Sequence, residues 1–206
     1  MNQETFDFED GNGPVPAHRH KNPDGSIGGW VAETAKVAVS ATVGPDARVF
    51  GKAQVSGEAK VFGQAWVFDD ARVFRQAQVL ENAQIYGQAQ VYDHAQVFDN
   101  ANIYGEAQLL GQAQVSGDAQ VFGDAQVSGD AKVFGDAQVS GDAQVFGDAT
   151  VSGDAQVCGQ ARVFGDMQVS GDAQSESKAE VSGPNLRAEL GAIQARRVQG
   201  KRVIGW

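Results

Sequence analysis

A six-residue repeat runs through most of the chain and limits the folds that it can adopt. In steps of six from Val31 to Val181, 25 of 26 positions hold Val, Ile or Leu, and in steps of six from Ala35 to Ala179, 24 of 25 positions hold Ala. No residue is inserted or deleted along this stretch, whose consensus unit reads Ala-Gln-Val-Phe/Ser-Gly-Asp. A short period of this kind predicts a solenoid, in which each unit buries its apolar residues against its neighbours.

The order of residues within one unit predicts a short strand followed by a turn. Ala and Val alternate with Gln and with the Phe/Ser position, so Ala and Val share the inward face of an extended segment. Gly-Asp then provides a turn, because Gly adopts a positive φ without strain. We expect a narrow interior filled by small Ala near the corners and larger Val at the strand centres.

The register Val-x-Gly-Asp-Ala-Gln resembles that of the hexapeptide-repeat proteins. This resemblance implies an all-β fold: a single-stranded, parallel β-solenoid in the form of a three-sided, left-handed β-helix. Three hexads would make one coil, which gives about eight coils and a rod roughly 40 Å long. An alternative is a two-sided coil of twelve residues, since Ser and Phe alternate strictly from Ser116 to Ser152.

The two ends of the chain lack the repeat. We expect an irregular N-terminal cap over residues 1–30, the β-helix over residues 31–182 and a C-terminal cap over residues 183–206, with a short amphipathic helix after Pro184. The entry Gly28-Gly29-Trp30-Val31 resembles that of uncharacterised phage and prophage hexapeptide-repeat proteins. The C-terminal segment carries a basic cluster that could contact an acidic partner: Arg196, Arg197, Lys201 and Arg202.

Composition limits the partners and the compartment. The formal net charge of −10 predicts repulsion from nucleic acid and anionic membranes, so we expect neither as a direct partner. Cys158 is the only cysteine, which rules out an internal disulfide. The first residues show no basic segment followed by an apolar one, so we expect no secretion signal. These features predict a protein of the host cytoplasm or a component of a virion.

Histidines are the candidates for chemistry. Hexapeptide-repeat proteins include acyltransferases with a histidine base, and this resemblance makes an acyltransferase one alternative function. The only histidine inside the array is His94, at a turn position where a solvated side chain is more common than a catalytic one. His18 and His20 could share a metal, although they lack carboxylate or Cys partners at ligand spacing. We therefore expect no enzymatic activity, no metal and no cofactor.

Outward aromatic residues are the candidates for an interface. Nearly every hexad in the first half of the array carries one, and contiguous exposed apolar surface usually marks an interaction site. Self-stacking of the rings along the rod is the alternative explanation. The interface candidates are Phe62, Phe68, Phe74, Tyr86, Tyr92, Phe98 and Tyr104.

Aspartates at the turn position form an acidic column. Three carboxylates per coil would give about one charge per 1.6 Å of rod, close to the charge spacing of duplex DNA. The rod could therefore mimic DNA, although Asp also suits turns and keeps a repetitive protein soluble. The acidic column consists of Asp118, Asp124, Asp130, Asp136, Asp142 and Asp148.

These observations favour a rigid scaffold or interaction protein that is not an enzyme. The uninterrupted repeat and the aromatic positions predict self-association, as a trimer or end to end, or binding to another protein. The alternative is a phage counter-defence protein that acts by DNA mimicry or by sequestering a ligand.

Overall fold

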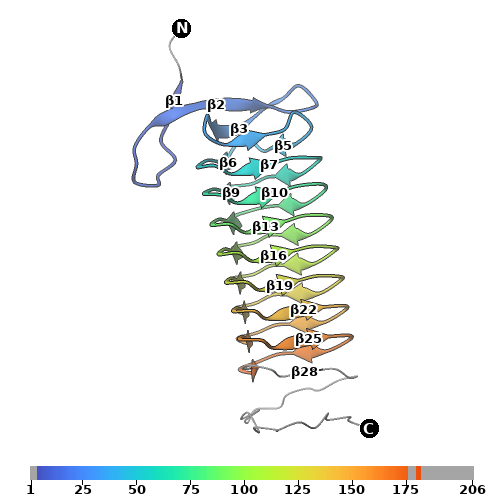
Figure 1. Cartoon of the computed structure of the whole chain (residues 1–206). Coiled ribbons are helices and arrows are strands. Elements are labelled where there is room, and N and C mark those ends of the chain that lie inside the picture. Colours follow the sequence, from blue (N-terminus) through green and yellow to red (C-terminus); the bar gives the residue numbers. More distant parts are fainter. Residues whose placement is uncertain (1–3, 176–179, 182–206) are drawn as a thin grey trace.

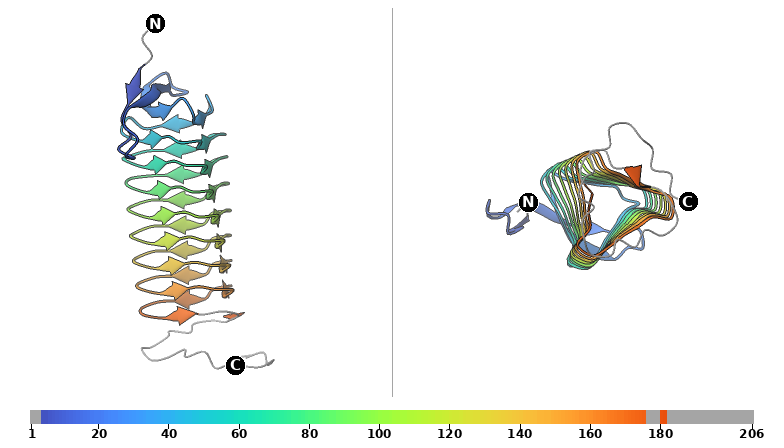
Figure 2. Two further views of the ribbon diagram at one scale, coloured as in Figure 1. Left: turned by 60° about the vertical axis from the view of Figure 1, so that its left-hand side comes forward. Right: turned by 90° about the horizontal axis from the view of Figure 1, so that it is seen from below.

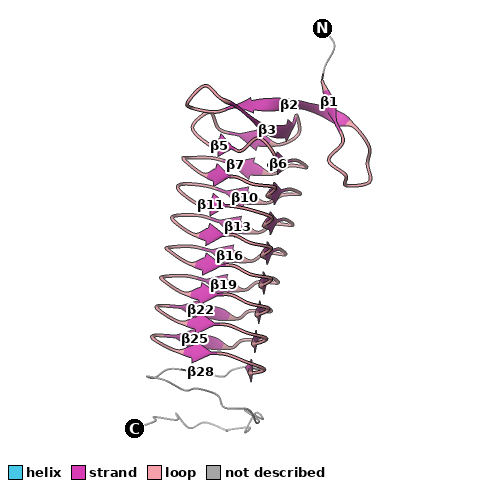
Figure 3. Ribbon diagram, turned by 180° about the vertical axis from the view of Figure 1, so that it is seen from behind, coloured by secondary structure: helices cyan, strands magenta, loops and turns pink. Residues whose placement is uncertain are grey.

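The chain forms a straight rod of stacked coils that is closed at one end by an N-terminal hairpin (Figure 1). This is a computed structural model, and it describes residues 4–175 and 180–181. All elements in the described part are strands (Figure 3). No helix with the length and apolar character needed to cross a membrane is present in these residues.

Each coil contains three strands that lie on three flat faces of a triangular rod (Figure 2). Between coils, paired strands are parallel and are three elements apart in sequence order, so that Gln84 pairs with Asn102 and Gln78 with Gln96. The coil therefore has 18 residues, which confirms the three-sided β-solenoid of about eight coils. The two-sided coil of twelve residues is wrong, because it would pair residues 12 apart. The left hand of the winding stays a prediction from the resemblance.

Face 1 is an eleven-stranded sheet that begins with the three N-terminal strands. Its order along the rod is β1-β2-β3-β6-β9-β12-β15-β18-β21-β24-β27. The bounds are β1 Thr5–Phe6, β2 Val15–Lys21, β3 Ile27–Ala32, β6 Arg48–Val49, β9 Trp66–Val67, β12 Gln84–Ile85, β15 Asn102–Ile103, β18 Gln120–Val121, β21 Gln138–Val139, β24 Gln156–Val157 and β27 Gln174–Ser175.

Faces 2 and 3 contain nine and eight strands, all parallel to their neighbours. Face 2 consists of β4 Lys36–Val37, β7 Gln54–Val55, β10 Arg72–Val73, β13 Gln90–Val91, β16 Gln108–Leu109, β19 Gln126–Val127, β22 Gln144–Phe146, β25 Arg162–Phe164 and β28 Glu180–Val181. Face 3 consists of β5 Thr42–Val43, β8 Lys60–Val61, β11 Gln78–Val79, β14 Gln96–Val97, β17 Gln114–Val115, β20 Lys132–Val133, β23 Thr150–Val151 and β26 Gln168–Val169.

The interior is one continuous apolar column. The repeated Ala and Val, Ile or Leu side chains from Ala41 to Val163 are buried almost completely, most of them with no exposed area. Met167 fills the one described Ala position that is not Ala and is also buried. A strand of two or three residues cannot bury its own apolar side chains, so stability arises from stacking successive coils.

The corners bring the backbone of successive coils into close contact. The first turn residue has a positive φ at every corner from Gly51 to Gly171, such as 66° at Gly141 and 60° at Asp93. A Cβ atom added to Gly141 would lie 3.0 Å from the backbone nitrogen of Gly159 in the next coil, so this corner favours Gly on two grounds. Five corners within the array hold a residue other than Gly at a positive φ: Asp69, Arg75, Glu81, Asp93 and Asp99.

The N-terminal segment, for which the sequence predicts an irregular cap, contains the three strands β1, β2 and β3. They form an antiparallel meander in which β2 pairs with both β1 and β3. The turn between β2 and β3 is closed by hydrogen bonds between Asn22 and Ser26 and between Gly25 and Asn22. β3 then continues into the first coil through its parallel pairing with β6. The predicted C-terminal cap and helix of residues 183–206 lie outside the described residues.

Candidate interaction surfaces

Side chains of the N-terminal segment cover the first strand of face 3. The buried Asn22 amide donates from Nδ2 to the Val43 carbonyl at 3.1 Å and accepts the Val43 N–H at Oδ1 at 2.9 Å. His20 Nε2 lies 3.0 Å from the Ala41 carbonyl, and Arg19 donates to the Pro45 carbonyl at 2.8 Å. These contacts replace the hydrogen bonds of a missing neighbouring strand and protect the edge of β5 from pairing with other chains.

Two glycines let β3 lie against the first coil. A Cβ atom on Gly28 would lie 2.3 Å from the Val43 carbonyl oxygen, and one on Gly29 would lie 2.1 Å from the Ala47 carbonyl oxygen. Both distances are far below any real contact of a Cβ atom, so any other residue would push β3 off the coil. The Gly-Gly-Trp-Val entry thus has a structural role at this end of the rod.

The two N-terminal histidines lie in different surroundings and contact different partners. The exposed His18 ring has its Nδ1 2.7 Å from a carboxylate oxygen of Glu33, whereas His20 is buried against the Ala41 carbonyl. In the described residues, no group of three His, Cys, Asp or Glu side chains is arranged to hold a metal ion.

A column of aromatic rings runs along face 1. Each ring stacks on the ring 18 residues further on, with centroids 4.9 Å apart from Phe50 to Phe68 and at every later step to Phe122. The buried Phe8 stacks on Phe50 at the same distance and extends the column into the N-terminal segment. In order, the column consists of Phe8, Phe50, Phe68, Tyr86, Tyr104 and Phe122.

Stacking leaves only the edges of these rings for a partner. The planes of Tyr86 and Tyr104 are 4° apart and those of Tyr104 and Phe122 only 1°, so neighbouring rings cover each other's faces. Burial raises the pKa of Tyr86 above its ordinary value of 10.0, and the nearby Tyr104 and Asp69 add to this effect. The column on face 1 thus matches the self-stacked alternative more closely than an open aromatic interface.

The seven predicted interface residues are divided among the three faces, because consecutive hexads lie on consecutive faces. Phe68, Tyr86 and Tyr104 lie on face 1, Phe74 and Tyr92 on face 2, and Phe62 and Phe98 on face 3. Phe74 and Tyr92 also stack, with centroids 4.9 Å apart. Among the aromatic residues that the structure describes, Phe62 and Phe134 are exposed, with 36% and 41% of their areas accessible, and both belong to face 3.

Sequence reasoning missed the part of the N-terminus that begins the aromatic column. Phe6 stacks on Trp30 with centroids 4.7 Å apart and contacts Phe8 edge to face at 5.0 Å. The guanidinium of Arg48 lies 5.5 Å from the Phe6 ring centroid, and an Arg48–Glu9 ion pair of 3.2 Å closes this layer. The alternation Phe6-Asp7-Phe8 is typical of a strand with one apolar face, and it is the sequence pattern that indicates packing of this segment against the rod.

The predicted acidic column is divided among the three corners of the rod. Asp118 and Asp136 lie on the corner that precedes face 1, Asp124 and Asp142 on the corner before face 2, and Asp130 and Asp148 on the corner before face 3. All six residues are exposed. Asp118 accepts a hydrogen bond from Asn100 Nδ2 at 2.9 Å, whereas no hydrogen bond of the other five carboxylates occurs within the described part of the chain.

Corner side chains link successive coils in the first half of the array. Asp99 accepts the Gly117 N–H at 2.9 Å, and Glu81 accepts the Asp99 N–H at 2.9 Å. On the neighbouring positions, Asn82 donates to Asn100 at 3.1 Å, and Asn100 donates to Asp118. These bonds connect each residue to the one 18 positions away and so stiffen the corner before face 1 along the rod axis.

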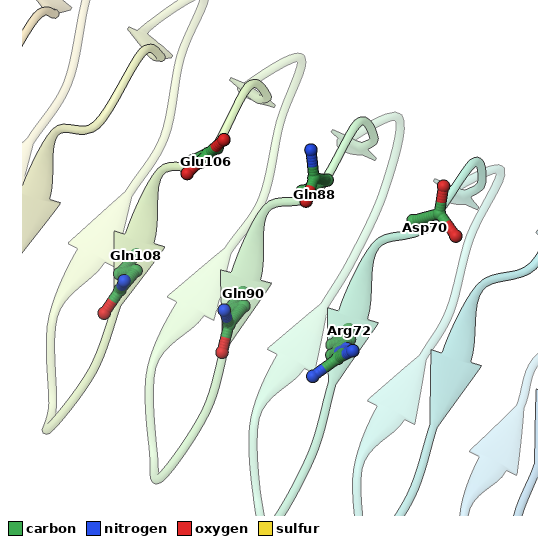
Figure 4. A pocket seen from close by; sticks show the side chains of 6 residues that line it. All are labelled: Asp70, Arg72, Gln88, Gln90, Glu106 and Gln108. Atoms are coloured by element: carbon green, nitrogen blue, oxygen red, sulfur yellow. The ribbon is translucent and has the colours of Figure 1, made fainter.

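A shallow polar depression lies on face 2 (Figure 4). It has a volume of about 550 Å³. Asp70, Gln88 and Glu106 line its corner side, and Arg72, Gln90 and Gln108 line its strand side.

His94, the histidine inside the array, lies away from this depression. It is exposed on the corner before face 3, between the equivalent positions of Gln76 and Gln112 in the neighbouring coils. The structure does not bring it together with the acidic side chains of the depression. The basic cluster of residues 196–202 lies outside the described residues.

Comparison with known proteins supports the class of fold. Residues 113–129, 125–141 and 143–159 match a family model described as the YdcK Beta solenoid repeat. Each matched segment runs from a repeat Ala to a repeat Gly and covers nearly one coil. No curated protein matches the chain. The chain is a repeat protein of the β-solenoid class, and its central coils are similar to those of the YdcK repeat.

Proposed function

We propose that this protein is a rigid scaffold or interaction rod that self-associates and is not an enzyme. The observation that carries the proposal is the unbroken 18-residue register from β4 to β28 on face 2, and equally on faces 1 and 3. Every outward side chain is thereby held about 4.8 Å from its equivalent in the next coil. Such a surface presents a fixed repetitive pattern, which suits a spacer or a docking platform.

Face 3 is the surface that we assign to self-association. It carries Phe62 and Phe134, the two exposed aromatic residues in the described part of the chain, whereas rings on faces 1 and 2 stack against one another. Leu80 and Phe98 continue the apolar strip from Phe62 along the rod, and Ser116 separates this strip from Phe134. Face 3 is flat and built from parallel two-residue strands, so a second copy can lie against it over several coils.

Sedimentation of the full chain over a range of concentrations tests this assignment. We expect the wild type to form oligomers and the double variant Phe62→Ser, Phe134→Ser to dissociate, because Ser occupies the equivalent position at Ser116 and should not perturb the fold. Phe164→Ser is the matched control, since it removes a ring that stacks on Phe146 on face 2. A wild type that stays monomeric at all concentrations would count against self-association.

A turnover assay tests the non-enzymatic part of the proposal. Purified wild type is incubated with acetyl and succinyl thioester donors and a panel of amine and hydroxyl acceptors, with His94→Ala as the comparison. We expect no turnover above background from either protein. Turnover by the wild type that is lost in His94→Ala would instead support the acyltransferase alternative.

The phage-related origin is part of the proposal and is supported by the Gly28-Gly29-Trp30-Val31 entry alone. The genomic neighbourhood tests it. Neighbouring genes for tail or particle components would favour a virion scaffold. A position among small genes expressed early in infection would favour a counter-defence protein.

DNA mimicry is the second candidate function, and one observation favours it. Asp124 and Asp142 on one corner, and Asp130 and Asp148 on another, are exposed, and their carboxylates make no hydrogen bond within the described residues, so turn formation does not account for these carboxylates. The test is competition between the rod and duplex DNA for a basic DNA-binding protein at several salt concentrations. DNA mimicry predicts displacement of the DNA that weakens steeply with salt.

A further inference from the structure

The N-terminal end of the rod has one open sheet edge. On face 1 the edge of β3 is covered by β2, and on face 3 the edge of β5 is covered by the side chains of Asn22 and His20. Face 2 begins with β4, and no strand in the described part of the chain pairs with its outer edge. An open edge of this kind can pair with an added strand.

The same three backbone groups are satisfied on β5 and unpaired on β4. On β5 the Val43 N–H, the Val43 carbonyl and the Ala41 carbonyl all bond to the side chains of the N-terminal segment. The equivalent groups six residues earlier belong to Val37 and Ala35, and they have no hydrogen-bond partner in the residues that the structure describes. One coil further on, the carbonyls of Ala53 and Val55 accept the N–H groups of Lys36 and Ala38, each at 2.8 Å. A strand added beside β4 would donate to the carbonyls of Ala35 and Val37 in the same way.

The apolar interior is also less covered at this edge. Val43 and Val49 on the neighbouring faces have no exposed area, whereas Val37 is only half-buried and packs against the margin of the core. A strand added beside β4 would therefore do two things at once. It would satisfy three backbone groups, and it would place an inward apolar side chain over Val37.

A single extended strand fits this edge, whereas a whole coil does not. The hairpin strand β2 already occupies the place next to β3 where the face 1 strand of an added coil would lie (Figure 1). The occupant must therefore be a parallel segment of a few residues with the pattern of the array's own strands. That pattern is a polar outward residue, an inward Val, an outward residue and Gly.

The chain itself contains such a segment outside the described residues. Arg202-Val203-Ile204-Gly205 matches Arg48-Val49-Phe50-Gly51 and Arg162-Val163-Phe164-Gly165, the latter two of which are strands of the array followed by their turn glycines. We propose that residues 202–204 of one copy add as a strand to β4 of a second copy and link rods end to end. This inference rests on the self-association proposed above and names a second surface for it.

A second copy suits the length of the connecting segment better than the same chain does. β4 and β28 are eight strand spacings apart on face 2, or about 38 Å at 4.8 Å per spacing. A random coil of 20 residues has a root-mean-square span of about 25 Å, which is shorter than this distance, so residues 182–201 would have to extend along the whole rod for the same chain to reach its own β4. The β4 edge of a second rod placed at the end of the first requires no such stretch.

Disulfide trapping between two single-cysteine copies tests the proposal. In a Cys158→Ser background, one full-length chain carries Lys36→Cys and a second carries Arg202→Cys, because the two outward residues would be direct neighbours in the parallel pair. Neighbouring Cα atoms about 4.8 Å apart lie within disulfide range. After mixing in a glutathione redox buffer, we expect a mixed dimer that contains most of the Lys36→Cys chain.

Matched controls define the register. Thr42→Cys places the thiol at the equivalent position on β5, whose edge is covered, and should give no mixed dimer with the Arg202→Cys chain. Adding Val203→Asp to the Arg202→Cys chain should abolish the crosslink, whereas adding Val198→Asp should not. Crosslinking at Thr42 equal to that at Lys36 would overturn the assignment of the edge.

Two other outcomes would overturn the proposal without touching the proposed function. A chain that carries both Lys36→Cys and Arg202→Cys, and that forms only an internal disulfide in the monomer, would show that the tail closes its own edge. Absence of any crosslink, with circular dichroism unchanged, would show that β4 takes no strand from residues 202–204. Self-association through Phe62 and Phe134 is measured separately by sedimentation and can stand in either case.

Discussion

The side-chain amide of Asn22 bonds to both the N–H and the carbonyl of Val43, at 2.9 and 3.1 Å, and so acts as the missing neighbour of β5. In the interior of the rod these two backbone groups would be satisfied by the preceding coil. One side chain thus provides on face 3 what the whole strand β2 provides on face 1. The N-terminal hairpin is therefore part of the hydrogen-bonded structure of the rod as well as a cover for its end.

Asn22→Ala should destabilise the N-terminal end. It leaves two buried backbone groups of Val43 unpaired, each of which costs about 1–3 kcal/mol. We expect the free energy of unfolding of the first coils to fall by about 2–4 kcal/mol, measured by urea unfolding monitored through tryptophan fluorescence, since Trp30 and Trp66 lie at this end. Asn12→Ala is the control, because Asn12 bonds only to the exposed Asp10. Equal effects of the two substitutions would contradict the role of Asn22.

Gly29→Ala should separate β3 from the first coil. Its new Cβ atom would lie 2.1 Å from the Ala47 carbonyl oxygen and 2.5 Å from that of Gly44, and both are backbone atoms that cannot move aside independently. Overpacking of this kind costs about 1–3 kcal/mol or more. Hydrogen exchange should show faster exchange in β2 and β3. Gly25→Ala is the comparison, because its positive φ of 85° adds strain while no atom lies within 4 Å of the new Cβ.

The repeat was sufficient to predict the fold because a single rule, an inward Val every six residues, determines the core. Val49, Val55 and Val61 are all fully buried on three different faces, and each depends only on its equivalents in the coils above and below. Each hexad forms one side of the rod, so a coil of three hexads has three sides. Local periodicity alone left that number open, because the alternation of Ser and Phe fits a coil of two hexads as well.

The surfaces could not be predicted to the same degree, because side chains adjacent in the sequence belong to different faces. Phe68 and Phe74 follow each other in the repeat, yet Phe68 stacks on Tyr86 and Phe74 stacks on Tyr92. The contacts of Phe8 and Asn22 with the array depend on how the hairpin folds back, and no repeat specifies that geometry. An irregular N-terminus was expected because this segment lacks the repeat and is rich in turn residues, whereas its three strands pair as an antiparallel meander.

The tyrosines should titrate later in the folded rod than in the unfolded chain. Burial raises the pKa of Tyr86, Tyr92 and Tyr104 above 10.0, because the charged phenolate is disfavoured within the ring stacks. Their contribution to stability is complete below pH 10 and is lost as the pH rises through the raised folded values. Absorbance at the phenolate band should therefore rise at higher pH in the native protein than in urea. Coincident curves would contradict burial of the rings.

Removing a whole coil should harm the rod less than removing one hexad. Deletion of residues 87–104 brings Phe122 next to Tyr86 and Asp118 next to Asn82, so the aromatic column and the corner bonds both re-form. Deletion of residues 87–92 keeps the Ala and Val core but places Leu110 beside Tyr86, which breaks the ring column at a cost of about 0.5–1.5 kcal/mol per lost stack. We expect the variant that lacks residues 87–104 to unfold at a higher urea concentration than the variant that lacks residues 87–92, and to keep its near-ultraviolet circular dichroism. The reverse order would mean that core burial alone, which scales with the number of hexads, sets the stability.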